Sequence, residues 1–303
     1  MEKRLEPCTF RCEETWDLMC GFRLIKRHVS LCLTIVWSEG VKTFIYSVYF
    51  TLGREAWLNL CLCEQSHTDD EQLTVAELLE EANRNLKRLH VHGDVAASSV
   101  SRREADSCVL SGCLWPRDPD GKVYVPYAVA NHYFSEELDV IRGAMDSFSN
   151  STCILFVPRS DQKDFLHIQS LPGCYSYVGR RGGGQLVSLS RRGCLHHGTV
   201  QHELLHALGF NHEHRRSDRD QHIRVLLENI MSGHEFNFDK VDTRNQETPY
   251  DYSSVMHYGR LAFSRDGSSP TMEAVPDAGA EFGRATRMSR DDVRRIKLLY
   301  CSD

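Results

Sequence analysis

Two histidines and a glutamate, spaced H-E-x-x-H, are the residues in this chain best placed to do chemistry. They are His202, Glu203 and His206. Positions four apart on a helix share a face, so the two imidazoles can bind one metal ion. Glu203 lies beside them, where it can take a proton from a water that the metal activates. The alternative interpretation is an ordinary helix with two surface histidines.

The residues that follow this motif favour the metal. Gly209 comes three residues after His206, and glycine can adopt the left-handed conformation that ends a helix and reverses the chain. His212 comes three residues later, where the returning chain can supply a third ligand. Three protein ligands leave a position open for water, which is typical of catalytic zinc. With a Met-turn at residues 254–258 (SVMHY), the pattern is the metzincin signature.

Two long segments of the chain resemble the astacin family of zinc endopeptidases. They are HELLHALGFNHEHRRSDRD (residues 202–220) and SVMHY (residues 254–258). The similarity covers about residues 104–303, and CYSYVGRRGGGQLVSL (residues 174–189) resembles the family's substrate-binding edge strand. The resemblance implies an α+β catalytic domain of the metzincin type, with two lobes, a zinc cleft between them and a short propeptide in front.

The resemblance also implies a role for each residue of the site. Glu203 would be the general base and then the acid that protonates the leaving amine. Tyr258 would be a switchable ligand that leaves the metal to hydrogen-bond the oxyanion. Met256 would form a hydrophobic floor under the metal, although an ordinary core methionine fits the same position. One Zn²⁺ ion per catalytic domain would be bound by three histidines: His202, His206 and His212.

Residues 64–103 resemble an inhibitory propeptide. The segment VHGDV (residues 91–95) is similar to the family's F-x-G-D-I motif, with valines in place of the aromatic residue and the isoleucine. Asp94 would then take the zinc position meant for water, since a carboxylate can be a fourth zinc ligand. A turn residue after Gly93 is the alternative interpretation of Asp94.

The dibasic pair at residues 102–103 is a predicted cleavage site for an activating protease. Cleavage after Arg103 would make Glu104 the new amino terminus. By resemblance, that terminus is linked to Glu213, the residue after the third histidine. A solvated surface carboxylate is the alternative interpretation of Glu213.

Twelve cysteines, even in number, widely spaced and without C-x-x-C pairs, favour disulfides and therefore a secretory route. By resemblance, Cys153 pairs with Cys301 and Cys174 with Cys194. Cys108 and Cys113 form an additional pair, as in the six-cysteine astacins of fishes, which include the hatching enzymes.

The first part of the chain, residues 1–63, stays unassigned. It holds six cysteines, its periodicity indicates no element, and it lacks a clean signal peptide although secretion requires one. We interpret residues 1 to about 40 as an incorrect gene model or alternative start. Residues 43–53 or 56–63 would be the remnant of the apolar signal core.

The predicted elements place strands early and helices late in the catalytic domain, which indicates an α+β class. A capping box at Thr74 begins a helix over 75–90. Apolar spacing predicts later helices over 135–148, 198–208 and 222–230, and one from 289 to about 300. Strands are expected at 123–129, 153–157, 165–169, 175–178 and 185–189.

Composition excludes several classes of protein. The net charge is −6, which argues against a nucleic-acid partner, and no apolar run is long enough to span a membrane. We therefore expect a secreted zinc endopeptidase, made as a zymogen, that hydrolyses extracellular proteins, with egg-envelope glycoproteins as candidate substrates. The alternatives are a six-cysteine astacin with a non-hatching role and a catalytically silent binding protein with the same fold.

Overall fold

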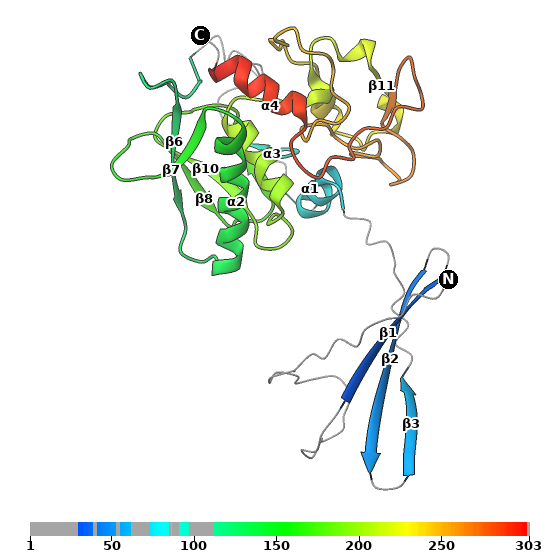
Figure 1. The fold of residues 1–303 in the computed structure, drawn as a ribbon. Coiled ribbons are helices and arrows are strands. Elements are labelled where there is room, and N and C mark those ends of the chain that lie inside the picture. The colour runs from blue at the N-terminus through cyan, green and yellow to red at the C-terminus, as the bar shows by residue number, and fades with distance from the viewer. Residues whose placement is uncertain are drawn as a thin grey trace. The chain divides into compact units, whose positions relative to one another are not determined.

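The computed structural model of the protein shows strands and helices mixed along the chain (Figure 1). It describes residues 30–38, 41–52, 55–61, 73–84, 86, 91–96 and 112–301. The chain divides into two units, Met1–Glu71 and Gln72–Asp303. Among the described residues, no helix has the length and apolar character needed to cross a membrane.

The first unit contains an antiparallel sheet in the order β1-β2-β3, for which the sequence periodicity gave no indication. Its strands are β1 (Ser30–Ser38), β2 (Val41–Leu52) and β3 (Glu55–Cys61). β2 is rich in aromatic and β-branched residues, which favour strands. β2 covers most of residues 43–53 and β3 covers most of residues 56–63, the two alternatives for the signal-core remnant.

A mixed sheet organises the second unit, in the order β4-β5-β9-β10-β8-β6-β7 among the described residues. The strands are β4 (Val91–His92), β5 (Val95–Ala96), β6 (Val123–Val129), β7 (Ile154–Pro158), β8 (Phe165–Gln169), β9 (Cys174–Ser176) and β10 (Gly184–Leu189). β6, β7, β8 and β10 run parallel to their neighbours in that group, whereas β9 is antiparallel to β10. The predicted strands of the catalytic domain are therefore confirmed.

Four α-helices lie among the described residues: α1 (Val75–Asn83), α2 (Ser135–Ser151), α3 (His197–Ala207) and α4 (Arg290–Ile296). A one-turn π-helix, Lys297–Cys301, extends α4. The capping boxes that begin α1 and α4 have Thr74 and Ser289 as caps. α2 begins at Ser135 and has Phe134 as its N-cap residue, whose N–H donates to the Glu137 carboxylate.

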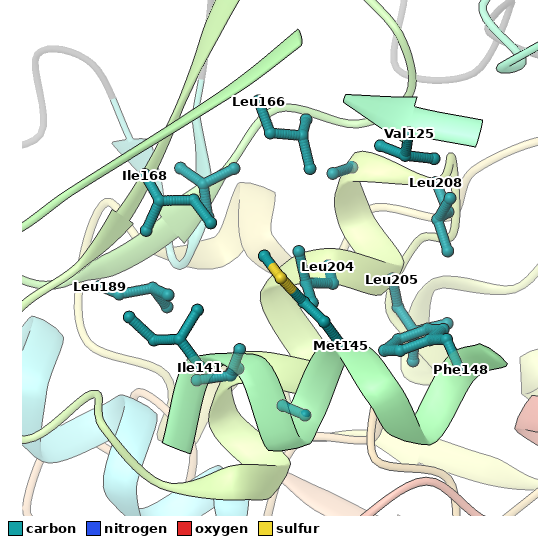
Figure 2. Close-up of a cluster of buried hydrophobic side chains, with 14 of the residues drawn as sticks. Val125, Ile141, Met145, Phe148, Leu166, Ile168, Leu189, Leu204, Leu205 and Leu208 are labelled. Carbon is teal, nitrogen blue, oxygen red and sulfur yellow. The ribbon is translucent and has the colours of Figure 1, made fainter. Parts of the chain in front are cut away.

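The helices pack on the sheet through one apolar core (Figure 2). Every three or four residues α2 places an apolar side chain on the face that meets α3, as the sequence period predicts. These side chains lie against strand residues of the sheet and are almost entirely buried. The labelled members are Val125, Ile141, Met145, Phe148, Leu166, Ile168, Leu189, Leu204, Leu205 and Leu208.

A second apolar cluster lies in the carboxyl-terminal part of the unit, and four of its nine buried members are phenylalanine or tyrosine. It includes residues of the two-stranded pair β11 (Ile223–Val225) and β12 (Met272–Ala274). Short 3₁₀ turns lie in the same part of the chain, at Glu213–Arg215, Arg219–Gln221, Leu227–Asn229 and Glu235–Phe238. Two clusters in one unit agree with an α+β fold of two lobes.

Two expected helices are wrong in extent or type. α1 ends at Asn83 rather than near residue 90, and the side chain of this last residue bonds the backbone of Cys174. The helix expected over 222–230 is replaced by β11 and a 3₁₀ turn. Pairing of Ile223 with Ala274, far along the chain, overrides the local pattern there.

Two disulfides have the partners that the family resemblance implied. Cys153 is bonded to Cys301, and Cys174 to Cys194. The first closes a loop over a sequence separation of 148 residues and ties the end of the π-helix to the start of β7. Cys113 is disulfide-bonded, and Cys108 lies outside the described residues.

Candidate metal centre

Helix α3 is buried within the second unit and contributes His202, Glu203 and His206 to the site. Its residues from Gly198 to Ala207 are all buried, so it is held on every side rather than on one face. Gly209, at φ 101°, ends the helix and donates its N–H to the His206 carbonyl. This is the left-handed cap that the sequence predicts.

Backbone carbonyls orient the two histidines of α3. Nδ1 of His202 lies 2.7 Å from the carbonyl oxygen of Val255, and Nδ1 of His206 lies 2.8 Å from that of Phe210. A carbonyl only accepts, so each Nδ1 carries the proton and each Nε2 keeps its lone pair free. Metal-binding histidines have this arrangement, in which an outer partner fixes the tautomer and the ring.

Asp94 lies among the three predicted histidine ligands. Its Oδ2 is 2.9 Å from Nε2 of His202, and its Oδ1 is 2.8 Å from Nε2 of His212 and 3.7 Å from Nε2 of His206. One ligand atom from each of these four buried residues lies within 4.8 Å of the others.

The donor set fits a metal ion. Although Nε2 of His202 and Oδ2 of Asp94 are close, neither has a properly directed hydrogen-bond partner among the described residues. Buried polar atoms without a partner are costly, and a cation between them would satisfy both. Three imidazole nitrogens with one carboxylate oxygen are a donor set typical of zinc.

The charges in this space perturb one another. Burial alone would raise the pKa of Asp94, but interactions with His212 and His202 hold it well below its usual range. Burial lowers the pKa of His212 to about 3, despite the nearby carboxylate. Burial, reinforced by repulsion from Asp94, raises the pKa of Glu203 well above its usual range. Neither Glu203 oxygen has a hydrogen-bond partner among the described residues, so this carboxyl is available for proton transfer.

Tyr258 points its hydroxyl into the same space and donates to Oδ1 of Asp94 at 3.0 Å. Burial, and then the neighbouring Asp94, raise the pKa of Tyr258 well above its usual range, so the phenol keeps its proton. The buried ring of His214 stacks on the Tyr258 ring, with centroids 4.3 Å apart and planes 24° apart. His214 thus packs against a residue of the site.

The Met-turn is held by a carboxylate whose role the sequence analysis missed. Buried Asp292, in the first turn of α4, accepts from the Ser254 hydroxyl at 2.6 Å and from the Val255 N–H at 2.9 Å. Since the Val255 carbonyl orients His202, Asp292 acts on the site through that backbone. The capping box at Ser289 was the only sequence signal for it. Met256 itself is buried in the apolar core.

Glu213 is buried in an ionic network instead of being a solvated surface carboxylate. It pairs with Arg295 and Arg216 and accepts the Asp251 N–H at 2.7 Å. Burial raises the pKa of Glu213 although Arg295 opposes that shift. A cavity of about 170 Å³ adjoins Glu213 and Arg295. Arg103 and Glu104 lie outside the described residues, so the predicted link between Glu104 and Glu213 stays a prediction.

A mixed α+β unit with a buried H-E-x-x-H helix, a third histidine and a Met-turn has the organisation of a zinc metallopeptidase. The model of the astacin peptidase family matches residues 115–301. The chain belongs to the astacin family, and it is therefore a zinc-dependent metalloendopeptidase.

Similar proteins include choriolytic enzymes of Oryzias latipes. The chain is 42% identical to High choriolytic enzyme 1 over 231 residues, which cover 76% of this chain and 85% of the relative. It is 43% identical to Low choriolytic enzyme over 235 residues, covering 77% and 86% respectively. The solved structure of High choriolytic enzyme 1, a hatching enzyme zinc-protease, superposes with a TM-score of 0.61 at 46% identity. The match covers 63% of this chain and 95% of that one.

Replacing Asp292 with alanine should weaken zinc binding, because the Val255 backbone that orients His202 loses its anchor. Outer-shell partners of this kind change metal affinity by roughly 10–100-fold. Competition with a chromophoric chelator measures the affinity. Asp291→Ala, at the neighbouring carboxylate of the same helix, is the control and should leave it unchanged; equal affinities for both variants would contradict the role of Asp292.

Proposed function

We propose that the chain is the precursor of a secreted zinc endopeptidase. Residues 64–103 are the propeptide and residues 104–303 the catalytic domain. The observation that carries this proposal is the Asp94 carboxylate lying among the imidazoles of His202, His206 and His212, where it can be the fourth ligand of their Zn²⁺ ion. A ligand supplied by the chain itself closes the position that catalysis needs open.

When bound, zinc supplies Lewis acidity, which polarises the scissile carbonyl and makes a water more acidic. Glu203 takes the proton of the attacking water and then passes it to the leaving amine. A base works best when its pKa is near the working pH. Removal of Asp94 takes away one of the two causes that raise the pKa of Glu203, so more of this carboxyl would be ionised at a given pH after activation.

Tyr258 is the proposed donor to the oxyanion of the substrate. Its hydroxyl is protonated and already points at the carboxylate oxygen that occupies the site in the precursor. After activation, the same donor is free for a substrate oxygen as negative charge develops there. Met256 supports the site from the core.

Activation proceeds by cleavage after Arg103 by another protease. The new amino terminus at Glu104 would enter the cavity beside Glu213 and pair with its carboxylate. The buried position of Glu213 and the space next to it support this role.

For the substrates, we propose extracellular proteins and, more narrowly, glycoproteins of the egg envelope. The similarity to choriolytic enzymes and the disulfides of the catalytic domain support both steps. An astacin acting elsewhere than the egg is the alternative. A catalytically silent binding protein has no support, since each residue that the chemistry requires is present.

Replacing Glu203 with glutamine should lower kcat for peptide hydrolysis by roughly 10²–10⁴-fold, because the amide cannot accept the proton. Zinc content, measured by atomic absorption, should remain at one per chain. The control Glu228→Gln changes an exposed carboxylate and should have full activity. Full activity in Glu203→Gln would sink the assignment of the base.

Replacing Asp94 with alanine should release activity from the uncleaved precursor. In a chain with Arg102 and Arg103 changed to glutamine, we expect hydrolysis of a quenched peptide to rise about tenfold or more, as loss of about 1.4 kcal/mol of binding would give. Asp118→Ala, at an exposed position, is the control. An Asp94→Ala precursor as silent as its parent would rule out inhibition by this carboxylate.

The cleaved enzyme should swell or dissolve isolated fish egg envelopes, and a zinc chelator should stop the reaction. Turbidity and released glycoprotein measure it. Unchanged envelopes, together with active cleavage of a general protein substrate, would favour the non-hatching alternative.

A further inference from the structure

Asn83, the last residue of α1, contacts the catalytic domain far from it in sequence. Its Nδ2 donates to the carbonyl of Cys174 at 2.8 Å, and its Oδ1 accepts the N–H of Cys174 at 2.8 Å. One side-chain amide thus satisfies both backbone groups of one strand residue. Nδ2 also lies 3.5 Å from the carbonyl of Gly93, in the turn that carries Asp94.

These bonds continue a ladder along the edge of β9. Backbone groups of residues two apart in a strand point to the same side. On that side, Ser176 donates its N–H to the carbonyl of Asp94 at 3.0 Å, and Cys174 donates to Asn83. The side-chain amide of Asn83 therefore takes the place of a peptide group in a strand added to this edge.

Gly173 makes the approach possible. It has φ +87°, and a Cβ there would lie 2.5 Å from Oδ1 of Asn83 and 2.6 Å from Cδ1 of Leu86. Any other residue would push both side chains away. Gly173 leaves room for a planar amide, and the N–H and carbonyl of the next residue, Cys174, provide its donor and acceptor.

We propose that Gly173 and Cys174 form a carboxamide-binding site, filled in the precursor by Asn83, and that it is a second anchor of the propeptide. The site uses no metal ligand. It therefore holds α1 and the turn of Asp94 on the edge strand whether or not zinc is bound. The inhibitory part of this inference rests on the proposed function of residues 64–103 as a propeptide.

The anchor completes the attachment of α1 at both ends. At its first residue, the Val75 N–H donates to the carbonyl of Ala285 at 2.8 Å, and the capping box of Thr74 fixes the start of the helix. At its last residue, Asn83 binds Cys174. Release of the propeptide therefore requires loss of this carboxamide contact as well as of the Asp94 contact.

The test is hydrogen exchange of the Cys174 amide in the full, uncleavable chain (Arg102 and Arg103 changed to glutamine), stripped of metal. Asn83→Leu removes both hydrogen bonds at similar size. We expect exchange at Cys174 to be about tenfold faster, as loss of such a bond gives. Glu81→Gln, at an exposed position of α1, is the control and should not change it. Reloaded with zinc, the Asn83→Leu chain should also hydrolyse a quenched peptide severalfold faster than its parent.

Amides of β8 and β10 report whether the variant is folded. If Asn83→Leu does not fold, Asn83→Ala, which removes the amide without adding bulk, decides. If the folded variant shows unchanged exchange at the Cys174 amide, the carboxamide-binding site is wrong. If exchange is faster but the uncleaved chain hydrolyses the quenched peptide no faster than its parent, the inhibitory role of the site is wrong. Failure of the proposed function would be seen separately, as a cleaved, zinc-loaded parent chain without peptidase activity.

Discussion

The constraint on which the structure depends is a buried carboxylate that faces three imidazole nitrogens. Such a group of polar atoms is costly to bury unless every atom has a partner. The fold supplies partners on the outside of the cluster: carbonyls bind the Nδ1 atoms of His202 and His206, and Tyr258 binds Asp94. The inner atoms point at one another, and this is the arrangement that a cation completes.

The Met-turn connects this cluster to both apolar cores. Val255 and Met256 belong to the core around α2 and α3, whereas Tyr258 belongs to the second apolar cluster, in the other lobe. The Met256 carbonyl accepts the N–H of Glu213, next to the third histidine. The Met-turn thus contacts both His202 of α3 and the residue next to His212. Asp292 of α4 holds this turn in place through its hydrogen bonds to Ser254 and Val255. The distances at the site are set by packing in two lobes at once.

Sequence reasoning succeeded where the signal is local. The spacing of His202, Glu203 and His206, with Gly209 after them, specifies a helix, its cap and its metal-facing side, all within about two turns. The predicted capping box at Thr74 marks a helix start for the same reason, and the predicted start of the last helix at Ser289 is confirmed with Ser289 as its cap. Most strands of the mixed sheet were found from their alternation or apolar runs.

The failures share a long-range cause. β11 pairs with a distant segment, Ile223 with Ala274, and no local pattern near residue 222 shows it. α1 ends early, at a residue whose side chain bonds a backbone group 91 residues along the chain. The role of Asp292 depends on a turn that only the folded lobe brings to α4. Periodicity records which face of an element is buried, but not which distant backbone group a side chain will bind.

In the precursor that we propose, the contacts of Asn83 and Asp94 satisfy groups that catalysis would later need. At the edge of β9, the N–H groups of Cys174 and Ser176 donate to the Asn83 side chain and the Asp94 carbonyl. The Asp94 carboxylate lies against the histidines and accepts from the Tyr258 hydroxyl. If the propeptide left, the edge of β9, the metal position opposite the histidines and the Tyr258 hydroxyl would all be open. A peptide substrate could then pair with each of them. The same groups therefore stabilise the closed precursor and bind substrate in the open enzyme. Inhibition of the proposed kind leaves the metal ligands, Glu203 and Tyr258 already assembled, so activation would need no refolding of the residues that do the chemistry.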